Sequence, residues 1–288
     1  MASSSSISRV GLDVGGVFVK AVVLDPEGRV THRVARRHHG NPVSVVGEEF
    51  RRLNIEGPVA VGVTGAYAHL VAGGLNLVPV DLVNAEIRAV RQVFPDARNI
   101  INVGGSSVTL IQLDAAGNFL DYSTNSLCAA GTGSFLDQQA DRLGIKYDEM
   151  KDFAHHDSPP PIATRCSVFA KTDLIHRQQE GYDKASLWCG LCKSTTGTFL
   201  NTLLRGRPLK GLTVLTGGVA QNREVMRWLN ARYGALVKTF DDAAYSCAIG
   251  GGESWCAKSF ISSYWIPSRS ACWSRNDPVP AAQRELVL

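Results

Sequence analysis

The sequence predicts an α/β fold made of two duplicated lobes with a cleft between them. The stretch "VGLDVGGVFVKAVVLDPEGRV" has the pattern of an apolar strand, a Gly-Gly turn, a second strand, a tight turn and a third strand. The stretch "INVGGSSVTLIQLDAAGNF" repeats this order at the same spacing, and helical patterns follow both copies. A third Gly-Gly pair, in "VLTGGVAQN", also ends an apolar run. A strand-and-helix unit that occurs twice is typical of two packed lobes.

The composition is that of a globular protein. The chain has 288 residues, of which 44% are hydrophobic and 19% charged, enough for one large domain or two lobes with their own cores. The net charge of +4 is mild and no Lys/Arg run is interleaved with aromatics, so no nucleic-acid partner is expected. No apolar stretch could span a membrane, and "MASSSSISRV" lacks a signal-peptide pattern. We therefore expect a cytoplasmic protein whose 7 cysteines do not form a disulfide framework.

Residues 1–98 are predicted to form the first lobe. In its opening unit, "DPEG" favours a tight turn, because Pro26 presets φ and Gly28 tolerates a positive φ. The spacing of "PVSVVGEEFRRLN" predicts a helix, and "GPVAVGVTGAY" predicts a buried strand that runs into a glycine turn. A second helix, "VDLVNAEIRAVRQVFP", should end at Pro95.

Residues 99–240 are predicted to form the second lobe. The repeated strand unit is followed by three helical stretches: one after Cys128, one after Cys166 that ends at Gly181, and "DKASLWCGLCKSTTGTFLNTLL". "LKGLTVLTGGVAQNREVMRWLNARYG" then has the pattern of a strand, a Gly-Gly turn and a helix, and "ALVKTF" that of a short strand. Residues 241–288 are expected to return to the first lobe and to end in a tail without an assignable pattern.

The Gly-Gly turns favour a nucleotide held between the lobes. Paired glycines let backbone N–H groups approach a phosphate closely. One such turn alone is more often a plain strand connection, but two of these three lie in a duplicated unit. Neither the P-loop pattern nor G-x-G-x-x-G is present. Asp13 could hold a hydrated Mg²⁺, and Lys20 could either reach a phosphate oxygen or remain a solvated lysine.

Cys128 and Cys166 have matching contexts, because each follows a turn or extended segment and precedes a helical pattern. A helix N-terminus stabilises a thiolate or an anionic cluster. An iron–sulfur cluster needs four thiolates, so two such cysteines per chain would require a two-fold dimer. The residues alone leave two alternatives open, buried structural thiols or a shared cluster.

The remaining cysteines and the histidines give weaker signals. "CGLC" has the spacing of a redox or zinc C-x-x-C, but it lies in a helical stretch without a second such pair. Packing of Cys189 and Cys192 on one helix face is therefore favoured. The adjacent histidines at 38–39 and at 155–156 would point apart, which argues against a metal site.

Four stretches carry a more specific similarity: "CAAGTGSFLDQQADRLGI", "CSVFAKTDLIHRQQEGY", "GLCKSTTGTFLN" and "VLTGGVAQNREV". With "VGLDVGGVFVKAVVLD", "VTGAY" and "NAEI", they resemble the ATP-dependent activators of 2-hydroxyacyl-CoA dehydratases and the ATP-binding subunits of benzoyl-CoA reductase. The resemblance runs from about Val10 to about Gly252. It implies an acetate-kinase/Hsp70/actin-like fold and one [4Fe-4S] cluster that bridges a dimer through two cysteines per subunit, which match Cys128 and Cys166.

The same resemblance implies a function. A reduced ferredoxin or flavodoxin would give one electron to the cluster, and ATP binding and hydrolysis would rotate the lobes. The electron would then pass to an acyl-CoA dehydratase or a benzoyl-CoA-type reductase at a much lower potential. The dimer could be a homodimer or a pseudo-symmetric heterodimer.

ATP and Mg²⁺ would then lie between the two duplicated turns. The nucleotide-binding candidates are Asp13, Gly15, Gly16, Val17 and Lys20 in the first lobe, Gly104, Gly105, Ser106 and Ser107 in the second, Gly217, Gly218 and Gln221 along the adenosine, and Gly131 and Gly133 as the link to the Cys128 helix. Asp13 and Glu86 are the catalytic candidates. Glu86, in "NAEI", matches a family glutamate that could position water, and the alternative is an ordinary glutamate on a helix surface.

The chain also departs from the family pattern. Asn102 and Ser107 stand where the family usually carries acids, and "TGAYAHL" replaces a "TGYGR"-like turn. The tail after Gly252 has no family counterpart. Slow hydrolysis, or a role as a nucleotide-binding partner subunit without catalysis, is thus an alternative. A sugar or amino-sugar kinase of the same fold is another, although no catalytic aspartate is present at the second Gly-Gly turn.

Overall fold

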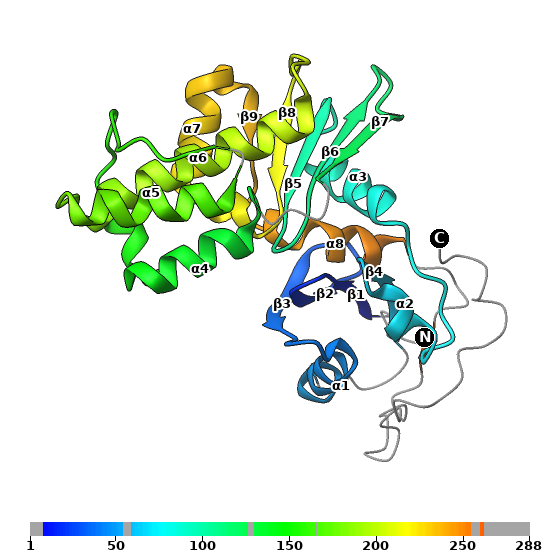
Figure 1. The fold of residues 1–288 in the computed structure, drawn as a ribbon. Coiled ribbons are helices and arrows are strands. Elements are labelled where there is room, and N and C mark those ends of the chain that lie inside the picture. Colours follow the sequence, from blue (N-terminus) through cyan, green and yellow to red (C-terminus); the bar gives the residue numbers. More distant parts are fainter. Residues whose placement is uncertain (1–7, 54–58, 126–129, 165, 255–259, 262–288) are drawn as a thin grey trace, which may run out of the picture.

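A computed structural model describes residues 8–53, 59–125, 130–164, 166–254 and 260–261. Two mixed five-stranded sheets lie in separate lobes, with helices α3 (Leu82–Val93) and α8 (Ser246–Glu253) between them (Figure 1). The duplicated architecture expected from the repeated strand unit is therefore confirmed. No helix in the described ranges is long and apolar enough to cross a membrane.

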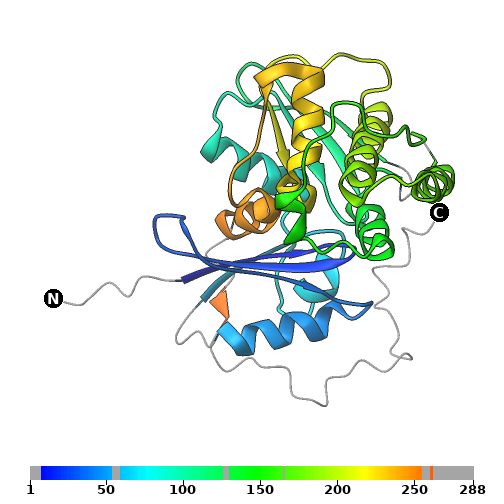
Figure 2. The same cartoon turned by 90° about the vertical axis from the view of Figure 1, so that its left-hand side faces the viewer.

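The sheet of lobe I has the strand order β10-β4-β1-β2-β3. Its strands, with their bounds, are β1 (Ser8–Val14), β2 (Phe18–Leu24), β3 (Val30–Arg37), β4 (Val59–Thr64) and β10 (Phe260–Ile261). β1, β2 and β3 form an antiparallel meander, and β4 runs parallel to β1. Helices α1 (Pro42–Leu53) and α2 (Ala68–Ala72) pack their apolar faces on one side of this sheet, and α1 covers it from below in Figure 2.

The sheet of lobe II has the order β7-β6-β5-β8-β9 and repeats the arrangement of the first four strands of lobe I, whereas its edge strand β9 is parallel to β8 and β10 is antiparallel to β4. Its strands, with their bounds, are β5 (Asn99–Val103), β6 (Val108–Leu113), β7 (Phe119–Thr124), β8 (Thr213–Thr216) and β9 (Val237–Lys238). β5, β6 and β7 are antiparallel, and β8 runs parallel to β5. The predicted tight turns are also matched, since Gly28 and Gly117 both have positive φ, at 86° and 83°.

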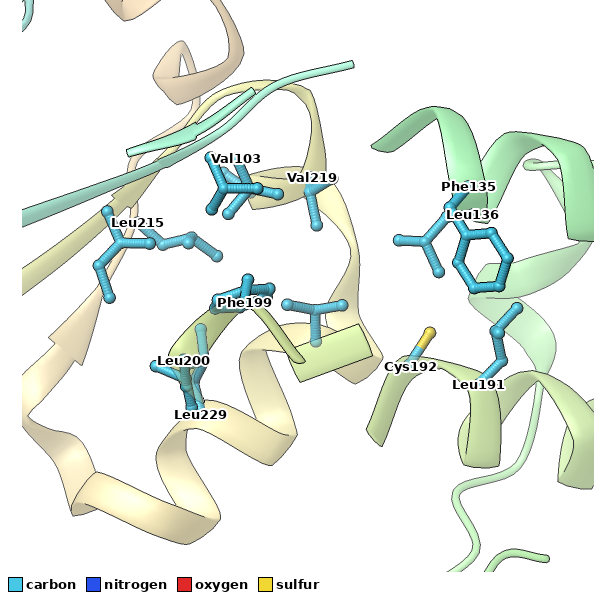
Figure 3. Close-up of a cluster of buried hydrophobic side chains, with 14 of the residues drawn as sticks. Val103, Phe135, Leu136, Leu191, Cys192, Phe199, Leu200, Leu215, Val219 and Leu229 are labelled. Carbon is cyan, nitrogen blue, oxygen red and sulfur yellow. The ribbon is translucent and has the colours of Figure 1, made fainter. Parts of the chain in front are cut away.

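The helices of lobe II build the larger core. They are α4 (Gly133–Leu143), α5 (Ser167–Gln179), α6 (Lys184–Leu204) and α7 (Arg223–Tyr233), joined by the short 3₁₀ helices η1 (Glu149–Asp152), η2 (Gly218–Gln221), η3 (Gly234–Leu236) and η4 (Ala243–Tyr245). Side chains from α4, α6 and α7 meet the sheet in one apolar cluster, with Phe199 of α6 and Leu215 of β8 among its members (Figure 3). Asp183 caps α6 by accepting a hydrogen bond from the Ser186 N–H, which fixes where this long helix begins.

Helix α8 lies between the lobes because glycines remove the side chains that would keep it away. A Cβ on Gly11 of β1 would stand 1.8 Å from the Ala248 carbonyl oxygen, and one on Gly62 of β4 would stand 1.9 Å from that of Gly251. A Cβ on Gly250 would stand 1.7 Å from the Ala85 carbonyl oxygen of α3. The helix therefore packs backbone to backbone against both neighbours.

The predicted division of the chain at residues 98 and 240 stays a prediction. The segment after residue 240 supplies α8, which packs on β1 and β4 of lobe I. Most of the tail, residues 255–259 and 262–288, lies outside the described residues.

Candidate functional site

The two duplicated Gly-Gly turns meet across the gap between the lobes. Each turn is closed in the same way, since the Gly15 N–H donates to the Phe18 carbonyl at 3.0 Å and the Gly104 N–H to the Ser107 carbonyl at 2.9 Å. A Cβ on Gly16 would lie 2.2 Å from the Ser106 hydroxyl oxygen. A side chain there would displace the Ser106 hydroxyl, so the two turns are in close contact at this point.

Val17 and Gly105 form the second contact between the turns. A Cβ on Gly105 would lie 2.9 Å from Cγ2 of Val17. The lobes are thus in direct contact at the position where the sequence predicts that phosphates bind.

Helix α4 begins at Gly133, and its first turn is attached to the second Gly-Gly turn. The Gly133 N–H donates to the Gly104 carbonyl at 2.8 Å, and the Ser134 N–H donates to the Gly105 carbonyl at 3.0 Å. Gly131, just before the helix, has a φ of +86°. The segment that follows Cys128 is therefore joined to the turn by backbone hydrogen bonds.

A cleft of about 350 Å³ opens between the lobes. That volume is within the usual range for a small-molecule site. Of the residues predicted to contact a nucleotide, the cleft is lined by Lys20, Gly104, Gly105, Gly133, Gly218 and Gln221. Asp13, Gly15, Gly16, Val17, Ser106, Ser107, Gly131 and Gly217 are not among its lining residues.

The sequence did not point to the opposite wall of the cleft. Tyr147, Met150 and Lys151 come from η1 and the segment before it, and Trp188 comes from α6. Phe18, Leu136, Asp137, Val219, Asn222, Arg223 and Glu224 complete the lining. Apolar and aromatic groups suit a nucleobase and the cations suit phosphates, but no sequence spacing marks these residues as a group.

Ionic and polar contacts link lobe I to the α4 side of the cleft. A guanidinium nitrogen of Arg37, at the end of β3, lies 2.8 Å from the Asp137 carboxylate of α4. Asp137 also accepts a hydrogen bond from the Tyr147 hydroxyl. Asp137 thus joins two cleft-lining segments of lobe II to a strand of lobe I.

Asp13 and Lys20 face each other across β1 and β2, where they form a register pair. The Lys20 ammonium nitrogen lies 3.9 Å from a carboxylate oxygen of Asp13. Burial raises the pKa of Asp13 above its ordinary value, the positive charge of Lys20 opposes this rise, and the negative charge of Glu86 adds to it. A bound cation would compensate the charge of this buried carboxylate.

Glu86 lies in a buried polar network at the point where α3, β8 and α8 converge. Its side chain accepts hydrogen bonds from Ser246 at 2.9 and 3.0 Å, from the Cys247 thiol at 2.7 Å and from the Thr216 hydroxyl. Glu86 is 1% exposed and does not line the cleft. The alternative of an ordinary surface glutamate is therefore wrong. Burial and the neighbouring Glu86 also raise the pKa of the Cys247 thiol.

The structure describes one of the two predicted cluster cysteines. Cys128 lies outside the described residues. Cys166 is the N-cap residue of α5 and is half-buried, so its predicted position at the mouth of a helix is confirmed. Val168 and Phe169, two and three residues after it in the first turn of the helix, are each 66% exposed. The two side chains form a small exposed apolar surface beside Cys166.

Cys189 and Cys192 lie on α6 but in different surroundings. Cys192 belongs to the apolar core, and Figure 3 shows its sulfur pointing toward Leu136 of α4. The Cys189 sulfur lies 3.7 Å from Nδ1 of His155 and 3.3 Å from Oε2 of Glu224. The packing role predicted for both cysteines thus describes Cys192, whereas Cys189 belongs to a polar cluster.

Comparisons with known proteins agree with this architecture. Residues 10–252 match the family described as the BadF/BadG/BcrA/BcrD ATPase family. The (R)-2-hydroxyglutaryl-CoA dehydratase activating ATPase of Acidaminococcus fermentans is 27% identical over 250 residues, which cover 85% of this chain and 95% of that protein. One of the subunits of the benzoyl-CoA reductase of Thauera aromatica is 26% identical over 256 residues, which cover 83% of this chain and 90% of that protein.

A solved structure has the same fold. The crystal structure of the Acidaminococcus fermentans (R)-2-hydroxyglutaryl-CoA dehydratase component A aligns with a TM-score of 0.72 at 25% identity. The alignment covers 86% of this chain and 96% of that chain. The acetate-kinase/Hsp70/actin-like fold expected from the sequence is confirmed.

Proposed function

The chain belongs to the BadF/BadG/BcrA/BcrD ATPase family, and from this premise we propose that it couples ATP hydrolysis to low-potential electron transfer. The acceptor would be an acyl-CoA dehydratase or a benzoyl-CoA-type reductase, since the relatives include a dehydratase activating ATPase and a component of a benzoyl-CoA reductase. The electron would pass through a [4Fe-4S] cluster shared by two subunits. The observation that carries this proposal is the position of Cys166 at the N-terminus of α5, beside two exposed apolar side chains.

The residues around Cys166 suit such a cluster. A thiol at a helix N-terminus faces unpaired N–H groups and the positive end of the helix dipole, which stabilise a thiolate and an anionic cluster. The exposed Val168 and Phe169 offer apolar surface for a second subunit at the same place. A homodimer or a pseudo-symmetric heterodimer would bring together four thiolates, two from Cys128 and Cys166 of each subunit. The cluster supplies storage of one electron, donated by a ferredoxin or a flavodoxin.

The cleft between the lobes would bind Mg²⁺-ATP. Lys20, Lys151 and Arg223 supply positive charge for phosphates, and Trp188 and Met150 supply apolar surface for the base. Asp13 would hold a hydrated Mg²⁺ next to Lys20. For one electron, a drop of several hundred millivolts costs on the order of 5–10 kcal/mol, so the proposed transfer would need to be coupled to nucleotide hydrolysis.

Helix α4 offers a direct link between the nucleotide and the cluster. Its first two N–H groups bind the carbonyls of Gly104 and Gly105, in the turn that would hold phosphate. The segment with Cys128 precedes this helix. A change in the turn on hydrolysis would therefore reach a cluster ligand through a short, hydrogen-bonded path.

The test is iron content with matched cysteine variants. Cys128→Ala and Cys166→Ala should each lose iron and weaken the dimer while ATP affinity stays nearly unchanged. The control is Cys192→Ala, because Cys192 is a buried core residue with no place in the proposed ligand set. Protein purified without oxygen is analysed for iron and for native mass. Normal iron in the Cys128 or Cys166 variant would contradict the assignment.

One observation favours a second candidate, a partner subunit that binds nucleotide and turns it over slowly. Asn102 and Ser107 are neutral at the second turn, so lobe II adds no carboxylate there for Mg²⁺ or for the attacking water. Tight ATP binding without phosphate release, even with the redox partner present, would support this candidate. Release that rises when the partner is added would support the first.

A further inference from the structure

We propose that His155, Cys189 and Glu224 form a binding site for one divalent cation of the zinc type, distinct from the proposed cluster cysteines. Nδ1 of His155, Sγ of Cys189 and one carboxylate oxygen of Glu224 converge within 4.8 Å of one another. Among the described residues, no other group of His, Cys, Asp and Glu side chains meets this condition. This inference stands independently of the function proposed above.

The three side chains come from separate elements that are fixed in place. Cys189 lies on α6 and is 1% exposed, and Glu224 lies in the first turn of α7 and is 8% exposed. The Asn222 side chain caps α7 by accepting from the backbone N–H groups of Glu224 and Val225. His155 follows η1 and reaches the pair from a third direction. Rigid helices thus hold two of the three donors.

The spacing of the donor atoms fits tetrahedral zinc. With ordinary zinc bond lengths and tetrahedral angles, sulfur should stand about 3.6 Å from each of the other donors, and nitrogen should stand about 3.3 Å from oxygen. The structure has 3.7 Å between Sγ and Nδ1, 3.3 Å between Sγ and Oε2, and 3.0 Å between Nδ1 and Oε2. Each distance is within about 0.3 Å of the value expected around one ion.

His155 and Glu224 each have a second polar atom that contacts a neighbouring side chain, and their other polar atom faces Cys189. Nε2 of His155 lies 3.3 Å from the carboxylate of Asp157, whose side chain is fully exposed, so this contact holds the imidazole only weakly. Oε1 of Glu224 accepts from Arg227 at 2.9 Å. The Arg227 contact leaves Oε2 of Glu224 to face the Cys189 sulfur.

The donor set decides the kind of metal. Thiolate, imidazole and carboxylate together suit Zn²⁺, whereas Mg²⁺ and Ca²⁺ prefer oxygen donors alone. Three protein ligands leave a fourth position for water or another small donor. Glu224 also lines the cleft between the lobes, so an ion here would fix one part of the cleft wall.

Without a cation, the same atoms form a hydrogen-bonded cluster. The Cys189 thiol lies 3.3 Å from each of two hydrogen-bond acceptors, the Glu224 carboxylate and the His156 carbonyl. Metal binding would replace the thiol proton, which passes to the buffer as the sulfur becomes a metal-bound thiolate. Proton release on binding therefore separates a metal site from a purely hydrogen-bonded cluster.

Cobalt is the probe, because Co²⁺ occupies zinc sites and its bond to a thiolate gives a charge-transfer band in the near ultraviolet. Metal-stripped, full-length protein is titrated with Co²⁺. We expect one equivalent to produce the band, one proton or more to be released, and Zn²⁺ to displace the Co²⁺.

Matched variants identify the residues whose binding of Co²⁺ produces the charge-transfer band. Cys189→Ser should remove it, and Glu224→Gln, which keeps the shape and loses the charge, should weaken Co²⁺ binding by more than roughly 100-fold. Asp157→Asn should weaken binding by roughly 5-fold or less, because the Asp157 side chain is fully exposed. Cys192→Ser is the control from the same helix and should keep the band, as should the Cys128→Ala/Cys166→Ala double variant. Circular dichroism checks that each variant folds.

Three results would overturn the proposal. The first is no thiolate band at one equivalent of Co²⁺ in the folded wild-type protein. The second is a band that disappears with Cys128 and Cys166, which would assign it to the proposed cluster site. The third is a band that persists unchanged in folded Cys189→Ser or Glu224→Gln, which would show that these atoms do not bind the ion.

Discussion

The central strands of the two sheets share one register but carry different charges. In lobe I, Asp13 of β1 pairs with Lys20 of β2, and at the equivalent place in lobe II, Asn102 of β5 pairs with Thr109 of β6. A buried ion pair in one lobe is thus a neutral pair in the other. The two turns thus keep the same geometry, while the carboxylate of this residue pair is present in lobe I and absent from lobe II.

The same strands also differ in what they present to the helices between the lobes. Gly11 pairs with Gly62 in lobe I, and this bare surface receives the backbone of α8. The equivalent pair in lobe II is Ile100 and Val214, which pack in an apolar cluster with Val90 of α3. One lobe holds its helix by close backbone contact and the other by interlocking side chains, so the two respond differently to changes in side-chain size.

The largest effect is expected from Gly11→Val, which gives lobe I a branched side chain like that of lobe II. The Cβ would meet the Ala248 carbonyl oxygen at 1.8 Å, so α8 must move, and we expect a loss of more than about 3 kcal/mol of unfolding free energy. Urea unfolding measures it. The matched control is Gly47→Ala in α1, where a Cβ would meet nothing within 4 Å. This variant should raise the free energy of unfolding by about 0.5–1 kcal/mol. Equal stability of Gly11→Val and wild type would contradict the close packing.

Asp13→Asn tests the charge difference by replacing the acid of lobe I with the residue that lobe II carries at the equivalent place. ATP turnover should fall by roughly 10- to 100-fold, because the carboxylate that would orient hydrated Mg²⁺ is lost. A phosphate-release assay at saturating Mg²⁺ measures this. Turnover equal to that of the wild type would remove Asp13 from the proposed site.

The same variant has an opposite effect on the stability of the nucleotide-free protein. Since burial raises the folded-state pKa of Asp13 above 3.8, ionisation of this group lowers stability as pH rises through the raised pKa. Asp13→Asn should therefore be no more stable than wild type well below pH 3.8 and more stable at neutral pH. Urea midpoints across this pH range give the difference, and a constant offset would contradict the assigned cause.

Ile100→Val sharpens the packing comparison from the side of lobe II. Removing one buried methylene from the cluster with α3 should cost about 1 kcal/mol, well below the cost of Gly11→Val. The measurement is again urea unfolding. A cost as large as that of the glycine variant would show that side-chain packing is no more tolerant than backbone contact.

The smallest effect is expected from Ser107→Asp, which returns an acid to the second turn. We expect phosphate release to rise a few-fold, since a carboxylate there could help hold Mg²⁺ or orient water. Ser106→Asp adds the same charge one residue away and is the control. An unchanged rate in Ser107→Asp would show that the missing acid does not limit hydrolysis.

Local patterns predicted the parts of the molecule that depend on neighbouring residues. The repeated strand unit, its tight turns and the helix after Cys166 all follow from apolar periodicity and from residues that fix or free φ, such as Pro26 and Gly28. The resemblance then identified the family. Gly104, Gly105 and Gly218, which line the cleft, were also accessible from sequence, because each belongs to a Gly-Gly pair that follows an apolar run.

The rest depends on tertiary packing, which no spacing encodes. Lys151, Trp188 and Arg223 reach the cleft from separate elements, and His155 meets Cys189 only because α6 packs beside the segment after η1. The histidine pairs were considered by themselves, so the convergence of His155 with Cys189 and Glu224 was not predicted. Glu86 also differs, since its burial becomes visible only when α8 brings Ser246 and Cys247 to it.

The ion pair between Arg37 and Asp137 has a consequence for product release. It connects β3 of one lobe to α4 of the other, and Asp137 lines the cleft, so any separation of the lobes would have to break it. Both side chains are partly exposed, at 43% and 23%, so dissolved ions weaken their attraction. If ADP leaves when the lobes separate, its residence time in the cleft should therefore shorten as the salt concentration rises. The salt concentration would then affect the rate of ATP turnover.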